Sequence, residues 1–193
     1  MARQKEFDRQ VVLEKAMETF WQQGYEGTSV QDLLKAMGLN RGSLYDTFGD
    51  KRSLFLEAIA HYENKVVQKA IAKLEAPNAG KAVIIAHFQG LVERLAGSDR
   101  AQWGCFMTNV AVELCNHDSE AAKRIKESMQ RFEQAFIHAL TNAQGQGDLS
   151  PEADVEALAC FLTCLMQGLR VVTKLERDRT TLEKIVNTAL AVL

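Results

Sequence analysis

The sequence predicts an all-α protein of about nine helices, and three observations support this prediction. The chain has 193 residues, of which 47% are hydrophobic, so it can bury a sizeable core. It contains only two prolines, and long stretches carry neither proline nor glycine, the residues that most damage helix interiors. Apolar residues recur at three- and four-residue spacing along most of the chain, and we find no convincing strand.

Two helices are predicted near the N-terminus, each with a recognisable start and stop. Asp8 suits the N-cap of the first helix, and Gly24 suits its end. Ser29 with Asp32 three residues later resembles a capping box at the start of the second helix, which stops at Gly38.

A tight turn separates the second helix from a short third one. Asn40 can cap this helix only two residues after Gly38, and Asp50 can cap a longer fourth helix that ends at Ala76-Pro77. A helix, a tight turn and a second short helix form the geometry of a DNA-reading helix-turn-helix. The same spacing also occurs in plain helical bundles.

Five further helices are predicted in the rest of the chain. In the eighth, apolar residues cover nearly the whole circumference, so we expect it to be buried on more than one side. We expect the helix-turn-helix to belong to a DNA-binding domain, residues 1–62, and the five later helices to a second domain, residues 63–193. The family resemblance given below implies that this second domain is a ligand-binding and dimerisation domain. The five helices span roughly residues 81–95, 105–115, 119–140, 152–174 and 181–193.

Bulk properties narrow the class of protein. The first sixty residues hold eight basic and nine acidic residues, so a DNA-binding surface would need its positive charge concentrated on one face. No signal-peptide core is apparent, and the most apolar stretch, Leu158 to Met166, is about half of a membrane span. We therefore expect a cytoplasmic protein with no membrane partner and no structural disulfides.

Enzymatic chemistry is not expected. The sequence shows no glycine-rich phosphate loop, paired-carboxylate motif or nucleophile elbow. Cys115 with His117 lacks any zinc-site spacing, and we expect no metal and no cofactor. A helical adaptor that binds other proteins is the remaining alternative to a DNA-binding regulator.

The first sixty residues carry a dense set of residues that recur together in one protein family: Ala16, Phe20, Gly24-Tyr25, Thr28-Ser29-Val30, Leu33, Gly38-Leu39, Gly42-Ser43-Leu44-Tyr45, Phe48, Lys51, Leu54 and Phe55. On these residues the segment closely resembles the TetR family of transcriptional regulators. The resemblance implies a homodimer of nine-helix subunits that binds palindromic operators in double-stranded DNA. It also implies a repressor that is released when a small-molecule effector binds.

The resemblance also implies which residues contact DNA. Thr28, Tyr45 and Lys51 are expected to contact phosphates, and Arg41, Gly42 and Ser43 are expected to contact bases. Asp46-Thr47 stands where many members carry larger aromatic or histidine residues, so Thr47 offers less to the backbone. Asp46 either accepts from a cytosine or is solvated. The full predicted set is Thr28, Ser29, Arg41, Gly42, Ser43, Tyr45, Thr47 and Lys51.

The Gly104-Cys105 pair, with a later Lys174, resembles the electrophile-sensing branch of the family. In that branch a cysteine reacts with quinones, aldehydes or hypochlorite, and a nearby lysine favours its thiolate. A helix N-terminus would lower the pKa of Cys105, whereas burial against Phe106 and Trp103 would raise it. The sequence leaves this balance open, and simple core packing is the alternative.

The remaining candidates surround an effector or form the dimer. Asn109 and Glu113, four residues apart on one helix face, either bind a ligand or join helices. Cys160 and Cys164 are interpreted as packing residues. The predicted ligand-binding residues are Trp103, Cys105, Phe106, Asn109, Glu113, Phe132, Phe136, Phe161, Leu165 and Lys174. The predicted dimer-interface residues are Leu158, Leu162, Leu165, Leu169, Leu182, Ile185, Val186 and Leu190.

Overall fold

The structure is a computed structural model that describes residues 7–97 and 99–193, so part of the predicted DNA-binding domain, residues 1–6, lies outside it. The described chain is all-helical. Because α4, one π-helical turn and α5 follow one another without a break, it contains nine separate α-helical segments, as predicted. The elements are α1 (Arg9–Gln23), α2 (Val30–Met37), α3 (Arg41–Phe48), α4 (Lys51–Tyr62), the π-helical turn (Glu63–Val67), α5 (Gln68–Leu74), α6 (Lys81–Gly97), a 3-10 turn (Asp99–Trp103), α7 (Phe106–Leu114), α8 (Ser119–Gln146), α9 (Val155–Val172) and α10 (Arg179–Leu190).

The predicted helix starts are confirmed by their hydrogen bonds. Asp8 accepts from the amide of Gln10 at 2.8 Å, and the Ser29–Asp32 capping box is complete. Asn40 and Asp50 each accept from the amide three residues later, at 2.8 and 2.6 Å respectively. These caps satisfy amides that would otherwise lack partners at the helix ends.

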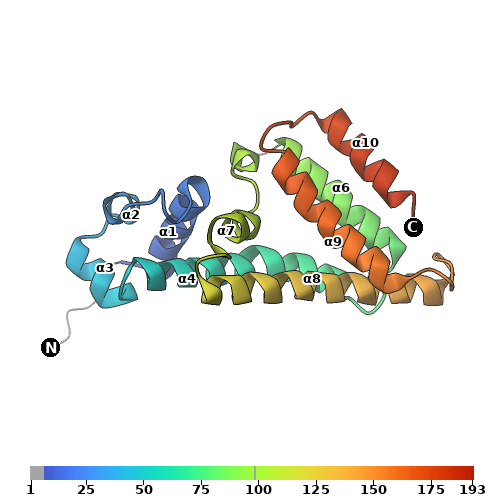
Figure 1. Cartoon of the computed structure of the whole chain (residues 1–193), viewed down its shortest axis with the longest axis horizontal. Helices are drawn as coiled ribbons and strands as arrows, with labels where there is room; N and C mark the ends of the chain where they lie inside the picture. Colours follow the sequence, from blue (N-terminus) through green and yellow to red (C-terminus); the bar gives the residue numbers. More distant parts are fainter. Residues whose placement is uncertain (1–6, 98) are drawn as a thin grey trace.

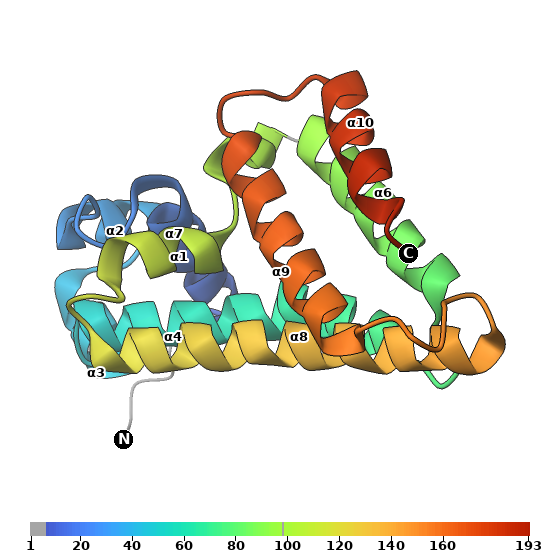
Figure 2. The same cartoon turned by 45° about the vertical axis from the view of Figure 1, so that its right-hand side comes forward.

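The two ends of the molecule are joined by long helices (Figure 1). α1, α2 and α3 gather at one end, and α6, α9 and α10 gather at the other. α8 runs along the base and packs against α5, α6, α7 and α9. Figure 2 shows α7 between the N-terminal helices and α9, so this short helix is placed to contact both parts of the chain.

The aromatic core is continuous between the two ends. Phe55 of α4 packs edge-on against Phe20 of α1, with ring centroids 5.1 Å apart, and also against Phe106 of α7, at 6.0 Å. The predicted boundary after Tyr62 falls inside the continuous α4–α5 helix, where the π-helical turn begins at Glu63. The division into two domains at this point stays a prediction.

α9 differs from its prediction in length and in burial. It ends at Val172, so Lys174 lies in the following turn rather than in the helix. Its 18 residues have a mean hydropathy of 1.6, which by length and composition alone would allow it to cross a membrane. The apolar stretch thus extends beyond Leu158 to Met166, although the core helix of a soluble protein passes the same test. The helix nevertheless packs along α8 through a buried face that includes Leu162 and Met166.

The outward face of α9 is also apolar, and it is not the face predicted for the dimer. Five predicted interface residues are buried within their own chain, because they pack into its core: Leu162, Leu169, Leu182, Val186 and Leu190. Leu158, Leu165 and Ile185 are half-buried. The exposed positions recur at helical spacing and include two of the cysteines expected to be packed: Cys160, Phe161, Cys164, Val171, Val172 and Leu175.

Candidate DNA-binding surface and thiol site

α3 presents one face to solvent and packs the other on the DNA-binding end. Leu44 and Phe48 are buried, whereas Arg41, Tyr45 and Asp46 are exposed. The Asn40 side chain caps the start of the helix, and Arg41 and Gly42 in its first turn are exposed. This is the geometry in which the second helix of a helix-turn-helix offers its N-terminal residues to a major groove.

Gly42 has no internal reason to be glycine. It is exposed, and a Cβ built on it would approach only the side-chain oxygen of Asn40, at 3.4 Å. Its φ is not in the left-handed region. Because the chain itself does not require glycine here, the open space fits the close approach of an external surface.

The hydroxyl groups of Thr28 and Ser29, which the resemblance assigned to DNA contacts, are both hydrogen-bonded within the chain. Thr28 is fully buried, and its hydroxyl donates to the carbonyl of Gly24 at 2.6 Å, so its side chain holds the turn before α2 together. A phosphate contact from this hydroxyl is therefore a wrong prediction. The Ser29 hydroxyl is engaged with Asp32 in the capping box.

Lys51 lies at the first turn of α4, with its ammonium group 4.3 Å from the ring centroid of Tyr25. The ring positions the cation without neutralising it. Sequence reasoning had matched Tyr25 to the family without giving it a role. The neighbouring Arg52 instead binds Asp118 and Glu120, at 2.9 and 3.0 Å, and so ties α4 to the start of α8.

Cys105 is the N-cap residue of α7 and is 2% exposed. The guanidinium of Arg170 donates to its Sγ at 3.3 Å, and the Tyr62 hydroxyl lies 3.7 Å from the same sulfur. Burial opposes ionisation of the thiol. The Arg170 charge and hydrogen bonds involving Thr108 and Tyr62 outweigh it, so the pKa of Cys105 lies below its ordinary value. The balance left open by the sequence is thus decided by a cation.

That cation is not the predicted one. Arg170 lies one helical turn before Lys174, and Lys174 instead runs past Gly104. A Cβ at Gly104 would lie 2.6 Å from Lys174 Cε, and its φ of 70° is also left-handed. The left-handed backbone favours glycine immediately before the thiol, and a Cβ there would also approach the carbonyl oxygen of Arg170 to 3.2 Å.

The predicted aromatic residues of the effector site are tightly packed. Phe132 lies under the Arg170 guanidinium, 5.9 Å from its carbon to the ring centroid, and Phe136 contacts His87 at 5.7 Å between ring centroids. Phe106 and Phe136 are no more than 1% exposed. Phe161 is 41% exposed on the outward face of α9, apart from the buried aromatic residues, so its role in an effector site stays a prediction.

His87 was not predicted as a site residue. Its Nε2 is buried without a hydrogen-bond partner in the described part of the chain. Burial, reinforced by the positive charges of Arg170, Arg94 and Lys73, lowers its pKa to about 4. The imidazole is therefore neutral at physiological pH.

Asn109 and Glu113 join parts of the chain instead of lining an effector site. Asn109 donates through Nδ2 to the carbonyl of Trp103 at 2.7 Å. Glu113 accepts from the amides of Tyr25 and Glu26, at 3.0 and 2.8 Å. The second alternative weighed from the sequence, a role in joining helices, is the one the structure supports.

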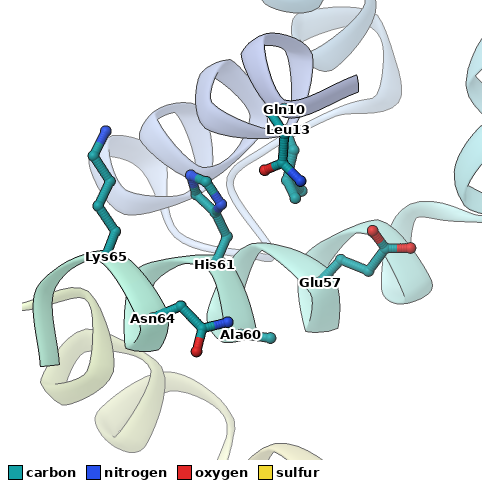
Figure 3. A pocket seen from close by; sticks show the side chains of 7 residues that line it. All are labelled: Gln10, Leu13, Glu57, Ala60, His61, Asn64 and Lys65. Atoms are coloured by element: carbon teal, nitrogen blue, oxygen red, sulfur yellow. The ribbon is translucent and has the colours of Figure 1, made fainter. Parts of the chain in front are cut away.

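A surface pocket of about 440 Å³ lies elsewhere, between α1 and the α4–π segment. In Figure 3, His61 and Lys65 extend toward α1, while Gln10 and Leu13 face them from it. His61 and Lys65 both pair with Glu14, at 2.6 and 2.5 Å. The charges at this end of the pocket are thus largely compensated, and no predicted ligand-binding residue lines it.

The helix-turn-helix at one end and the helical bundle behind it define a DNA-binding transcriptional regulator. Comparison with known families agrees: residues 12–58 match the family described as bacterial regulatory proteins of the tetR family. Residues 80–189 match the tetracyclin repressor-like C-terminal domain. The chain belongs to the TetR family.

Relatives and solved structures cover the whole length of the chain. It is 41% identical to the uncharacterized HTH-type transcriptional regulator YezE of Bacillus subtilis, with 100% of both chains covered. It is 32% identical to the transcriptional repressor ComR of Escherichia coli, covering 97% of this chain and 88% of ComR. A cysteine-substituted variant of the TetR family regulator CifR, solved with a 26-base-pair operator, is 30% identical with a TM-score of 0.87 and 98% coverage of each chain.

Proposed function

We propose that this protein is a homodimeric, cytoplasmic repressor that is released from a palindromic operator when an electrophile modifies Cys105. The observation that carries the effector part is the buried Cys105–Arg170 contact of 3.3 Å. The naming of ComR as a repressor, and the operator complex of CifR, support the DNA-binding part.

The DNA-binding surface combines base-facing and phosphate-facing groups. Arg41 and Gly42 are exposed in the first turn of α3, where arginine can pair with a guanine edge and glycine permits close approach. Lys51 adds its charge at the N-terminus of α4, a position that favours phosphate. Arg41 and Lys51 would supply positive charge where the DNA is bound, although the overall charge of the N-terminal segment is balanced.

The effector would act by removing a charge from a packed site. The Cys105 thiolate adds to an electrophilic ring carbon of a quinone: a carbon–sulfur bond forms, the carbon–carbon π bond breaks, and its electron pair moves onto the quinone oxygen, which takes a proton from water. The sulfur becomes a neutral thioether that can no longer ionise beside Arg170, and the adduct adds atoms at a site where Cys105, Phe106 and Phe132 are already buried. Unpaired buried charge and overpacking are both destabilising, so α7 and α9 must shift.

The outward face of α9 would form the dimer. Phe161, Val171 and Val172 are 41%, 50% and 41% exposed in one copy, and Leu175 is 95% exposed. An apolar stripe of this length on a soluble regulator calls for a partner surface. A second copy of the same helix supplies it, which also matches the two-fold symmetry of a palindrome.

The test begins with an operator selected from random duplexes by the purified protein. Binding should weaken with salt, and Lys51→Ala should flatten that dependence by about one charge. Iodoacetamide, whose carbon is attacked by the thiolate with loss of iodide, should release the wild type but not Cys105→Ser. Cys115→Ser is the matched control, because burial raises the pKa of the Cys115 thiol. An operator complex that survives with Cys105 fully alkylated, as judged by mass spectrometry, contradicts the proposal.

A further inference from the structure

We infer that Glu113 is a positioning residue for DNA binding: its carboxylate fastens the turn between α1 and α2, which precedes the helix-turn-helix, to α7. The inference has two parts. The first, that Glu113 supports operator binding, concerns the unmodified protein. The second, that modification of Cys105 disturbs the Glu113 contact, rests on the proposed function.

The contact is a two-pronged one. Glu113 Oε2 accepts from the amide of Tyr25 at 3.0 Å, and Oε1 accepts from the amide of Glu26 at 2.8 Å. Both amides belong to the turn between α1 and α2, and the two residues are almost ninety positions away in sequence. Hydrogen bonds from backbone amides to a carboxylate are charge-assisted and stronger than neutral ones.

The local sequence makes room for this carboxylate. Gly24 has a φ of 79°, and a Cβ built on it would lie 2.8 Å from Glu113 Oε2. Any side chain at this position would push the carboxylate away from the two amides. Gly24 thus serves both the end of α1 and the approach of Glu113.

The other end of α7 is also attached to α1, next to the thiol. Trp21 Nε1 donates to the carbonyl of Gly104 at 3.1 Å, and its ring packs on Trp103 and Tyr62, at 5.6 and 5.2 Å between centroids. α7 has nine residues, so it spans about 13 Å between these attachments. One rigid helix therefore joins Cys105 at its start to the DNA-binding turn at its end.

A displacement of α7 cannot leave both attachments unchanged. The helix is packed through Phe106, Met107 and Val110, each no more than 4% exposed, so it moves as a unit and not by bending. Loss of the Glu113 contact would free the turn before α2 and with it the orientation of α3. Operator affinity should then fall even when Cys105 is unmodified.

The test compares Glu113→Gln and Glu113→Ala with Val112→Ala, a control at an adjacent position that is 80% exposed on the same helix. In full-length unmodified protein, both Glu113 variants should bind the selected operator about tenfold more weakly, as expected for loss of a charge-assisted hydrogen bond. Amide hydrogen exchange at Tyr25 and Glu26 should accelerate. A purely structural role would lower thermal stability without selectively exposing these two amides.

A second measurement needs no substitution at Glu113. Iodoacetamide should accelerate exchange at Tyr25 and Glu26 in the wild type and leave it unchanged in Cys105→Ser. Wild-type affinity and unchanged exchange in Glu113→Gln would overturn the inference. If instead the Glu113 variants weaken binding while iodoacetamide fails to release the wild type, the effector proposal fails and the positioning role of Glu113 stands.

Discussion

Arg170 of α9 and Cys105 at the start of α7 share one hydrogen bond of 3.3 Å between guanidinium and sulfur. The contact brings a cation to a thiol that is 2% exposed. It also links α9, whose outer face is apolar, to the helix that contacts the DNA-binding turn. Four predictions follow from this arrangement and from the surfaces around it.

Arg170→Gln should slow alkylation of Cys105 at neutral pH, because removing the cation raises the pKa of the thiol. The thiolate fraction falls about tenfold for each unit of pKa increase. The rate of iodoacetamide reaction, measured against pH by mass spectrometry, should show its midpoint displaced to higher pH. Lys174→Gln is the matched control and should change the alkylation rate less. If Lys174→Gln slows alkylation more than Arg170→Gln does, Lys174 is the cation that lowers the pKa of Cys105.

Gly42→Ala should stabilise the protein while weakening operator binding. Alanine favours a helix interior over glycine by about 1 kcal/mol, and a Cβ here meets only Asn40 within the chain. The same Cβ would obstruct a major groove. Gly145→Ala is the matched control, because a Cβ at this position in α8 meets nothing within 4 Å; it should stabilise the protein without changing operator affinity. Thermal melting measures the change in stability, and operator titration measures the change in affinity. If Gly42→Ala binds the operator as tightly as the wild type, α3 does not enter the major groove as we propose.

Phe161→Glu should produce a folded monomer, since it places a charge in the proposed interface and not in the core of its own subunit. Light scattering measures the mass, and circular dichroism verifies the helix content. Val112→Glu, at an exposed position on α7, should remain dimeric. Leu190→Glu should instead unfold the chain, because Leu190 packs inside it. A dimer that survives Phe161→Glu places the interface elsewhere.

The buried imidazole of His87 should make stability depend on pH. Its pKa is about 4 when folded, against 6.5 for the unperturbed group, so the unfolded chain binds more protons between these values. The free energy of unfolding should therefore fall as the pH drops from about 6.5 to about 4, by at most about 1.4 kcal/mol per pH unit. His87→Leu should flatten this part of the profile in urea titrations. His117→Gln, which alters an exposed histidine, should leave it unchanged.

The helices and the family could be predicted from the sequence because their signals are local. A cap and the amide it accepts from lie within three residues of each other, as at Asn40 and Ser43, so their contact does not depend on the rest of the fold. The DNA-binding motif has the same character, since a short helix, a turn and another helix are contiguous. Arg41, Gly42 and Lys51 accordingly lie on the surface where the motif predicted them.

Only the tertiary structure decided which faces are buried and which distant groups meet. The circumference of α9 is apolar throughout, so the sequence could not tell its core face, which holds Leu162, from its outer face, which holds Phe161. The sequence placed Arg170 and Lys174 on one helix, but α9 ends before Lys174, and it is Arg170 that meets Cys105 while Lys174 lies beside Gly104. The amides that Glu113 binds lie almost ninety residues away in sequence. They meet its carboxylate only because the folded chain brings α7 beside the turn that follows α1.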